Sequence, residues 1–172
     1  PERAAEGIEY AHERGCRVFL AINTYPRPEG WSRWTAAVDT AAQLGVDALI
    51  VADIGVLDYA SSRHPDLPLH LSVQGSATSA EALELYQQQF GIRRAVVPRV
   101  LSLAQVRVLC ETAPVEIEVF GFGSLCVMVE GRCTLSSYVT GQSPNMNGVC
   151  SPASAVRWEQ KPEALESRLN DV

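Results

Sequence analysis

Three cysteines lie on one glycine-rich stretch that follows an apolar run at residues 115–120: Cys126, Cys133 and Cys150. Thiolates grouped in this way, in a chain without secretory features, are typical ligands of a soft metal ion or an iron–sulfur cluster. Three such ligands fit a cluster with one position vacant, or a site whose fourth cysteine is not in this chain. The spacing therefore predicts a thiolate metal site in the second part of the sequence.

Two other interpretations of these cysteines stay open. Structural zinc is commonly bound by closely spaced C-x₂₋₄-C pairs, whereas the gaps here are six and sixteen residues. Buried, unreactive thiols would not need the surrounding glycines, which allow backbone amides to approach sulfur closely. The two remaining cysteines, Cys16 and Cys110, lie next to apolar runs, and we expect them to be ordinary buried thiols.

Short apolar strands alternate with helical stretches ahead of the cysteines. Strands are expected at residues 17–22, 47–52, 69–73, 94–98 and 115–120, and helices at 1–14, 32–43, 55–62, 79–90 and 102–111. Ser32 is expected to cap the second helix, and Gly45 to end it. Strands separated by single helices indicate parallel β/α units rather than a meander.

The predicted fold class is α/β. Residues 1–121 form a partial TIM-barrel-like (βα) repeat of about five parallel strands, and residues 122–172 form a Cys/Gly-rich cluster-binding segment with the start of a C-terminal region. A doubly wound sheet fits the same pattern. Because a closed barrel needs eight strands, we expect the chain to be truncated at both ends.

A polar residue stands at or near the end of every predicted strand, and this set favours the barrel, in which several strand ends contribute to one site. Asp53 and Glu118 are the candidate catalytic residues, for proton transfer. Candidate substrate-binding residues are Arg99 for a carboxylate, and Asn23 and Gln74 for hydroxyl or carbonyl groups. Each has a plainer interpretation: Asp53, for example, could cap the helix that follows it, and Arg99 could form a surface ion pair.

The composition limits the partners and the location. The chain has 172 residues, is 47% hydrophobic and carries a formal net charge of −6. It shows no cluster of lysine and arginine, so RNA is a less favoured partner than a small molecule. No apolar stretch is long enough to span a membrane, and the N-terminus lacks a signal-peptide pattern. These features predict a cytoplasmic protein.

The stretch at residues 118–136 resembles the signature of the collagenase-like peptidase U32 family. That signature has a Glu and a Phe two residues later, then Gly-Ser/Ala-aliphatic-Cys, and finally Gly-x-Cys-x-aliphatic-Ser. Its positions here are Glu118, Phe120, Gly123, Ser124, Leu125, Cys126, Gly131, Cys133, Leu135 and Ser136. Residues 20–26, 52–57, 70–79 and 97–106 also resemble successive strand ends of that family.

The resemblance is nearest to the iron–sulfur branch that contains the ubiquinone-biosynthesis U and V proteins. It implies a [4Fe-4S] cluster on Cys126, Cys133 and Cys150, with a fourth cysteine beyond Val172. It further implies oxygen-independent hydroxylation of a ubiquinone precursor or an RNA base, with prephenate as a possible oxygen donor. A small aromatic substrate and a heterodimer with a paralogous U32 protein are the partners that it favours.

Two rival functions remain. A U32-type peptidase is suggested by the family name, but His12, His64 and His70 do not lie at predicted strand ends, and the H-E-x-x-H motif is absent. The other rival is a non-catalytic, cluster-bearing scaffold in a heterodimer. Its interface would use exposed tryptophans, for which the candidates are Trp31, Trp34 and Trp158.

Overall fold

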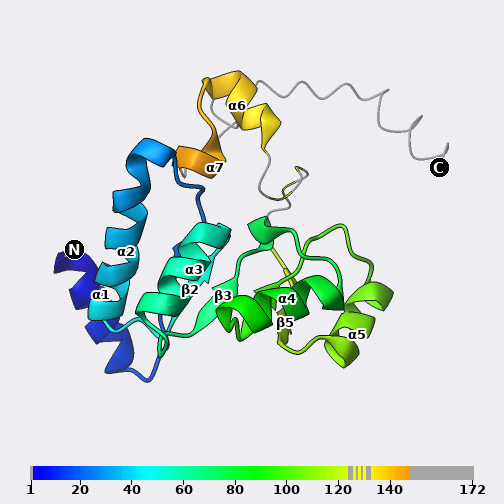
Figure 1. Cartoon of the computed structure of the whole chain (residues 1–172), viewed down its shortest axis with the longest axis horizontal. Coiled ribbons are helices and arrows are strands. Elements are labelled where there is room, and N and C mark those ends of the chain that lie inside the picture. Colours follow the sequence, from blue (N-terminus) through cyan, green and yellow to red (C-terminus); the bar gives the residue numbers. More distant parts are fainter. Residues whose placement is uncertain (1, 124–125, 127, 129, 131–132, 148–172) are drawn as a thin grey trace.

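In the computed structural model, residues 2–123, 126, 128, 130 and 133–147 are described. Five helix–strand units alternate along the chain (Figure 1). They are α1 (Glu2–His12), β1 (Phe19–Ile22), α2 (Trp31–Gln43), β2 (Ala48–Val51), α3 (Ile54–Arg63), β3 (Leu69–Leu71), α4 (Ala80–Phe90), β4 (Arg94–Val96), α5 (Leu103–Thr112) and β5 (Glu116–Glu118). Two short helices, α6 (Thr134–Thr140) and α7 (Pro144–Asn147), follow them.

The five strands form one parallel sheet in the order β1-β2-β3-β4-β5. Neighbours in space are therefore neighbours in sequence. A doubly wound sheet reverses its strand order at a switch point, and no such reversal occurs in this sheet. The sequential order is that of a barrel segment, so the predicted α/β class with a partial (βα) arrangement is confirmed.

One face of the sheet carries the hydrophobic core. The strand residues in it alternate along each strand, as in Leu49 and Val51 of β2 and Leu69 and Leu71 of β3. The pairings of Leu49 with Leu69 and of Leu71 with Ala95 continue this face across the sheet. Right-handed crossovers place successive helices on the same side of a sheet. The helices accordingly contribute Val38, Leu57, Leu83 and Leu109 to the same core.

The opposite face of the sheet carries polar and aromatic side chains. His70 pairs in register with Ile50 of β2 and Arg94 of β4. Its ring also meets that of Phe19 of β1, with the ring centroids 5.0 Å apart in an edge-on arrangement. His70 is 7% exposed, and burial holds its pKa below the usual histidine value. Desolvation therefore favours a neutral ring at this position.

Local capping signals set the start of several helices. Ser79 caps α4 by accepting a hydrogen bond from the amide of Ala82. Ser102 and Gln105 form a capping box at the start of α5. The prediction for Ser32 was wrong: α2 begins at Trp31, directly after the 3₁₀ turn Pro28–Gly30, so Ser32 lies inside the helix. Gly45 follows the end of α2 with a φ of +70°, as expected of a helix stop.

Two cysteines are exposed where burial was expected. Cys16 lies in the connection between α1 and β1, and Cys110 lies on α5. On α5 the core contact is made by Leu109. The next residue along a helix points about 100° away, so an apolar neighbour in sequence does not bury it.

Among the described residues, no helix has the length and apolar character that crossing a membrane requires.

The core assignment predicts a contrast between two leucines. Leu49 is fully buried, whereas Leu103 is 86% exposed. Replacing Leu49 by Ala should lower the free energy of unfolding by about 2–5 kcal/mol, because it leaves a cavity. The matched Leu103→Ala change should stay within about 0.5 kcal/mol of the wild type. Equilibrium urea unfolding measures both, and equal losses would contradict this assignment of the core.

Candidate functional site

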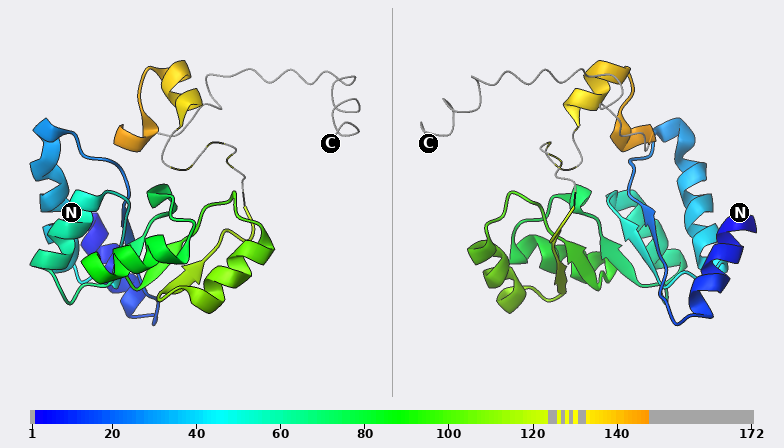
Figure 2. Two further views of the ribbon diagram at one scale, coloured as in Figure 1. Left: turned by 45° about the vertical axis from the view of Figure 1, so that its right-hand side comes forward. Right: turned by 180° about the vertical axis from the view of Figure 1, so that it is seen from behind.

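The polar residues singled out from the sequence gather at one edge of the sheet. Asn23 follows β1 directly, Asp53 and Gln74 follow β2 and β3, Arg99 follows β4, and Glu118 ends β5. Parallel strands present all their carboxyl ends on the same edge. Helices α6 and α7 lie beyond this edge (Figure 2). The structure thus places the five candidates and the cysteine-bearing segment at the same end of the sheet.

Asp53 is the N-cap of α3. Its Oδ1 accepts a hydrogen bond from the amide of Val56 at 3.0 Å. The side chain is half-buried. A cap of this kind satisfies an amide that the first helical turn leaves without an intrahelical partner. Asp53 therefore has a structural role, and a catalytic role would be additional to it.

Glu118 belongs to an ion-pair cluster on the face of the sheet opposite the helices. Arg94 donates to Glu118 Oε2 at 3.3 Å from Nη1, and to Glu116 Oε2 at 2.7 Å from Nη2. The hydrogen bond from Arg94 is the main cause that lowers the pKa of Glu116. Both glutamates are exposed. Arg94 therefore orients the Glu118 carboxylate at the end of β5.

Arg99 is held by a glutamate that lies 31 residues further along the chain. Glu130 Oε1 accepts from both the backbone amide and Nε of Arg99, each at 3.0 Å. The Glu130 side chain is only 3% exposed. Burial alone would raise the pKa of this carboxyl. Its hydrogen bonds, above all that from the Arg99 amide, and the guanidinium outweigh burial and hold the pKa below the usual glutamate value.

A second contact joins the same glutamate to the end of β3. The Ser76 hydroxyl donates to the backbone carbonyl of Glu130 at 3.3 Å. Ser76 has a φ of 53°, in the left-handed region, and ends the 3₁₀ turn Val73–Gly75. Glu130 therefore attaches the cysteine-bearing segment to the loops after β3 and β4.

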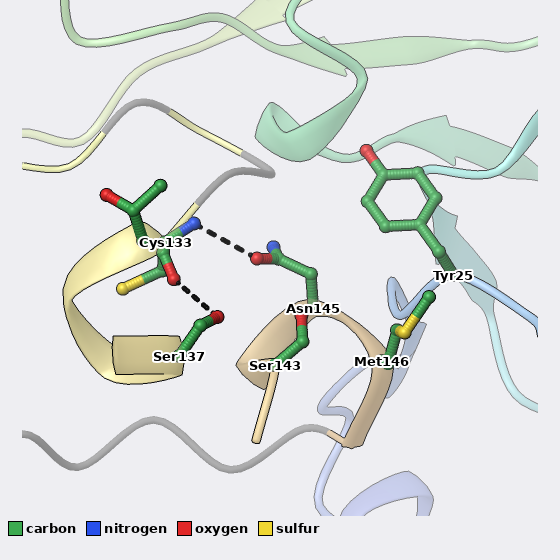
Figure 3. Close-up of a pocket in the computed structure, with 7 residues that line it drawn as sticks. Tyr25, Cys133, Ser137, Ser143, Asn145 and Met146 are labelled. Carbon is green, nitrogen blue, oxygen red and sulfur yellow. Dashed lines mark hydrogen bonds between the residues drawn. The ribbon is translucent and has the colours of Figure 1, made fainter. Parts of the chain in front are cut away.

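Cys133 lies at the start of α6 and is half-buried. Its sulfur accepts a hydrogen bond from the amide of Ser136 at 3.4 Å. Its carbonyl accepts one from the Ser137 hydroxyl at 2.9 Å (Figure 3). Ser136 Oγ lies 3.1 Å from the sulfur and is fully buried. Ser136 and Ser137 therefore hold the sulfur and the carbonyl of Cys133 in the first turn of α6.

Asn145 connects Cys133 to the strand ends. Its Oδ1 accepts from the amide of Cys133 at 3.1 Å, and its Nδ2 donates to Gln74 Oε1 at 3.3 Å. The Asn145 carbonyl accepts from the amide of Tyr25 at 2.7 Å. The Tyr25 hydroxyl in turn donates to the carbonyl of Gln74 at 2.7 Å. The segment after β5 is thus bonded to the loops after β1 and β3.

An open cavity of about 480 Å³ lies beside Cys133 (Figure 3). Cys133 and Tyr25 lie on opposite sides of Asn145. The lining residues come from the loop after β1 and from the segment that contains α6 and α7: Tyr25, Cys133, Thr134, Ser137, Ser143, Asn145 and Met146. The cavity has the size of a small-molecule site, and a thiol is part of its wall.

The two described candidate ligands suit a thiolate-bound group. Cys126 is exposed and Cys133 is half-buried, so neither is a core thiol. Cys150 lies outside the described residues. Within the described part of the chain, no three ligating side chains come together as a metal site. The donor chemistry of Cys126 and Cys133 fits an iron–sulfur cluster, which remains a prediction.

Three site residues were missed from the sequence: Tyr25, Glu130 and Asn145. Each acts through a partner that is distant in the chain, so no local motif marks it. The position of Glu130 between Cys126 and Cys133 is the one available signal, because an acidic residue among thiolate ligands calls for a compensating cation.

The sequence matches the family described as Peptidase family U32 over residues 1–170. It is 33% identical to tRNA hydroxylation protein P of Escherichia coli over 167 residues, 96% of this chain and 36% of that protein. It is 32% identical to the Escherichia coli 23S rRNA 5-hydroxycytidine C2501 synthase, over 91% of this chain and 23% of that protein.

A relative with a different name is a collagenase of Porphyromonas gingivalis, 30% identical over 83% of this chain and 36% of that protein. The chain therefore spans little more than a third of these relatives at most. A solved structure of a U32 peptidase superposes with a TM-score of 0.63 at 18% identity, over 92% of this chain and 70% of that one. That likeness supports the fold.

The Glu130–Arg99 contact should depend on pH. The folded pKa of Glu130 lies below its ordinary value of 4.5, so the unfolded chain takes up the proton first as the pH falls. The contact contributes fully above pH 4.5 and is lost as the pH falls through the folded pKa. We expect the hydrogen-exchange protection of the Arg99 amide to be constant at neutral pH and to fall only as the pH drops below 4.5.

The matched variant is Glu130→Gln, which keeps an acceptor oxygen but cannot titrate. Its Arg99 amide should have less protection than the wild type at neutral pH and no fall in protection specific to the acid range. Protection of the β3 amides serves as the internal reference in both proteins. An Arg99 amide whose protection does not change with pH in the wild type would refute this role of Glu130.

Proposed function

This chain belongs to peptidase family U32, and we propose that it carries the cysteine-containing part of an enzyme that hydroxylates RNA without dioxygen. The observation that carries the proposal is Cys133, a half-buried thiol held against the carboxyl ends of β1 and β3. The relatives named for tRNA and 23S rRNA hydroxylation support this choice of substrate class.

Cys126, Cys133 and Cys150 are the residues that would hold a [4Fe-4S] cluster, with a fourth cysteine outside this chain. When bound, such a cluster supplies one-electron chemistry. The protein's contribution to this site is the hydrogen bond from the Ser136 amide to the Cys133 sulfur. Hydrogen bonds to the sulfurs are one of the means by which a protein tunes a cluster's potential.

Proton transfer is assigned to Glu118 and Asp53. Arg94 fixes the Glu118 carboxylate at the end of β5, so its position is set before substrate binds. Asp53 uses Oδ1 as the helix cap, and its other oxygen has no hydrogen-bond partner among the described residues. Either carboxylate can accept a proton from a substrate bound at the strand ends.

Substrate contacts are assigned to Asn23, Gln74 and Arg99. Prephenate stays the proposed oxygen donor, and it carries carboxylates for which Arg99 is the expected cation. Because Glu130 already occupies Nε of Arg99, a second carboxylate would have to bind another nitrogen of the guanidinium. A bidentate pair through Nε is therefore excluded while Glu130 is in place.

RNA replaces the small aromatic substrate as the preferred partner. The names of two relatives refer to RNA, and none of the relatives compared above is named for a quinone precursor. The net charge of −6 does not favour binding of this chain to phosphates. We therefore assign the reacting base to the strand-end site, and the backbone contacts to other parts of the full-length protein.

Hydrolysis of peptides is the second candidate, favoured by the relative named as a collagenase. A cysteine or serine nucleophile needs an adjacent base. Among the described residues, no histidine contacts Cys126 or Cys133. His64 pairs instead with Asp39 at 2.7 Å, between α3 and α2 and outside the strand-end edge. The site therefore fits hydrolysis less well than thiolate-ligand chemistry.

The scaffold role in a heterodimer also stays a prediction. Trp31 is 38% exposed, whereas the Trp34 ring nitrogen donates to Thr24 and its ring packs against the core. Trp158 lies outside the described residues. Trp31 is thus the described tryptophan with surface to offer a partner.

The thiolate assignment is tested by metal content in the full-length protein, purified without air. We expect about four irons and four sulfides per chain, and loss of both in Cys133→Ser. Cys110→Ser is the matched control, because Cys110 is an exposed thiol on α5. Zinc in place of iron, or unchanged iron in Cys133→Ser, would overturn the assignment.

The two roles of Asp53 are separable by Asp53→Asn. Asparagine caps a helix as well as aspartate, so stability should change by less than about 0.5 kcal/mol, whereas Asp53→Ala should cost about 1 kcal/mol. Loss of the general base should lower hydroxylation by about a hundredfold or more. Mass spectrometry of RNA from cells that carry each variant measures the modified base. Full modification in Asp53→Asn would leave Asp53 as a cap alone.

A further inference from the structure

Asn145 makes three hydrogen bonds that no helix or strand requires. Its side chain bonds the Cys133 amide on one side and the Gln74 side chain on the other, and its carbonyl bonds the Tyr25 amide. Twelve residues separate Asn145 from Cys133, and 71 separate it from Gln74. A single half-buried amide therefore bridges the cysteine-bearing segment and the loop after β3.

The direction of each hydrogen bond follows from the first one. A backbone amide is a donor only, so the Asn145 atom that faces Cys133 must be the oxygen. The other end of the Asn145 amide is then the NH₂ group, which must meet an acceptor. The Gln74 atom that faces it is therefore Oε1, and the Gln74 NH₂ group remains. That group has no hydrogen-bond partner among the described residues.

We propose that Asn145 is a positioning residue, which holds Cys133 against the strand ends and sets Gln74 as a hydrogen-bond donor. The site that Gln74 faces accordingly recognises a substrate atom with a lone pair, such as a carbonyl oxygen, rather than an N–H group. The Cys133 amide and the Gln74 side chain are linked through Asn145 by two consecutive hydrogen bonds. A displacement of one is therefore transmitted to the other.

We call the two hydrogen bonds that join the Cys133 amide, Asn145 and Gln74 the relay. The relay differs from the Glu130–Arg99 contact because its strength does not depend on the charge of a side chain. Asn145 and Gln74 are neutral, so their hydrogen bonds do not titrate. Glu130 fixes the stretch before Cys133, and Asn145 fixes Cys133 itself. The position of the thiol therefore does not depend on the charge of Glu130 alone.

The donor and acceptor order of the relay predicts that the effects of two carboxylate substitutions, Asn145→Asp and Gln74→Glu, are not additive. In Asn145→Asp, one oxygen still accepts from Cys133, and Gln74 can turn its amide to donate to the other. In Gln74→Glu, an oxygen still accepts from Asn145 Nδ2. In the double variant two carboxylates face each other with no proton between them at neutral pH, so the relay must open.

The experiment measures hydrogen exchange at the Cys133 amide in the full-length protein at pH 7. Asn145→Ala should raise the exchange rate about fivefold, the Boltzmann factor of one net hydrogen bond. The two single carboxylate variants should stay within about twofold of the wild type. The double variant should match Asn145→Ala.

Asn145→Asp combined with Gln89→Glu is the matched control, because Gln89 is exposed on α4. It adds the same two charges and should behave as Asn145→Asp does alone. Protection of the β3 amides shows that every variant is folded. An Asn145→Asp rate equal to that of Asn145→Ala, or a double variant that exchanges no faster than the singles, would overturn the proposal.

Discussion

In-register parallel pairing between strands that follow one another in sequence is the constraint on which this structure depends. Each strand must be reached by a crossover helix, and the crossovers have one hand, so the helices cover one face of the sheet. The same pairing brings every strand end to one edge. Asn23 and Glu118, which are distant in sequence, therefore lie at the same edge of the sheet.

The segment after β5 joins that edge through two contacts of opposite character. Glu130 is a buried carboxylate, and its desolvation is offset by Arg99 and by backbone donors. Asn145 is a neutral bridge whose direction is set by the Cys133 amide. A charged contact of this kind is costly if one partner is lost, whereas an amide bridge can adapt by rotation. Together they hold the Cys133 thiol beside the cavity, although no described residue of the segment after β5 belongs to the hydrophobic core.

Local signals made most of the fold predictable from the sequence. Ser79 and Ser102 start helices because a cap and its target lie within one turn, and apolar runs mark the strands. The cap expected at Ser32 was wrong because a preceding turn extends into the helix. The strand-end residues were predicted as a set, but their partners were not. Arg99 bonds to Glu130, and Gln74 to Asn145, across 31 and 71 residues of sequence, so no local pattern marks these pairs.

Strands β1 and β5 each pair on one side only in the described sheet. Their other sides present a row of backbone donors and acceptors, which can serve as a template for another strand. Phe120 and Phe122, just after β5, are exposed as well. A separately expressed piece with these borders would consequently be prone to self-association and aggregation. At the same open borders a further strand could pair with this sheet without displacing any strand that is already paired.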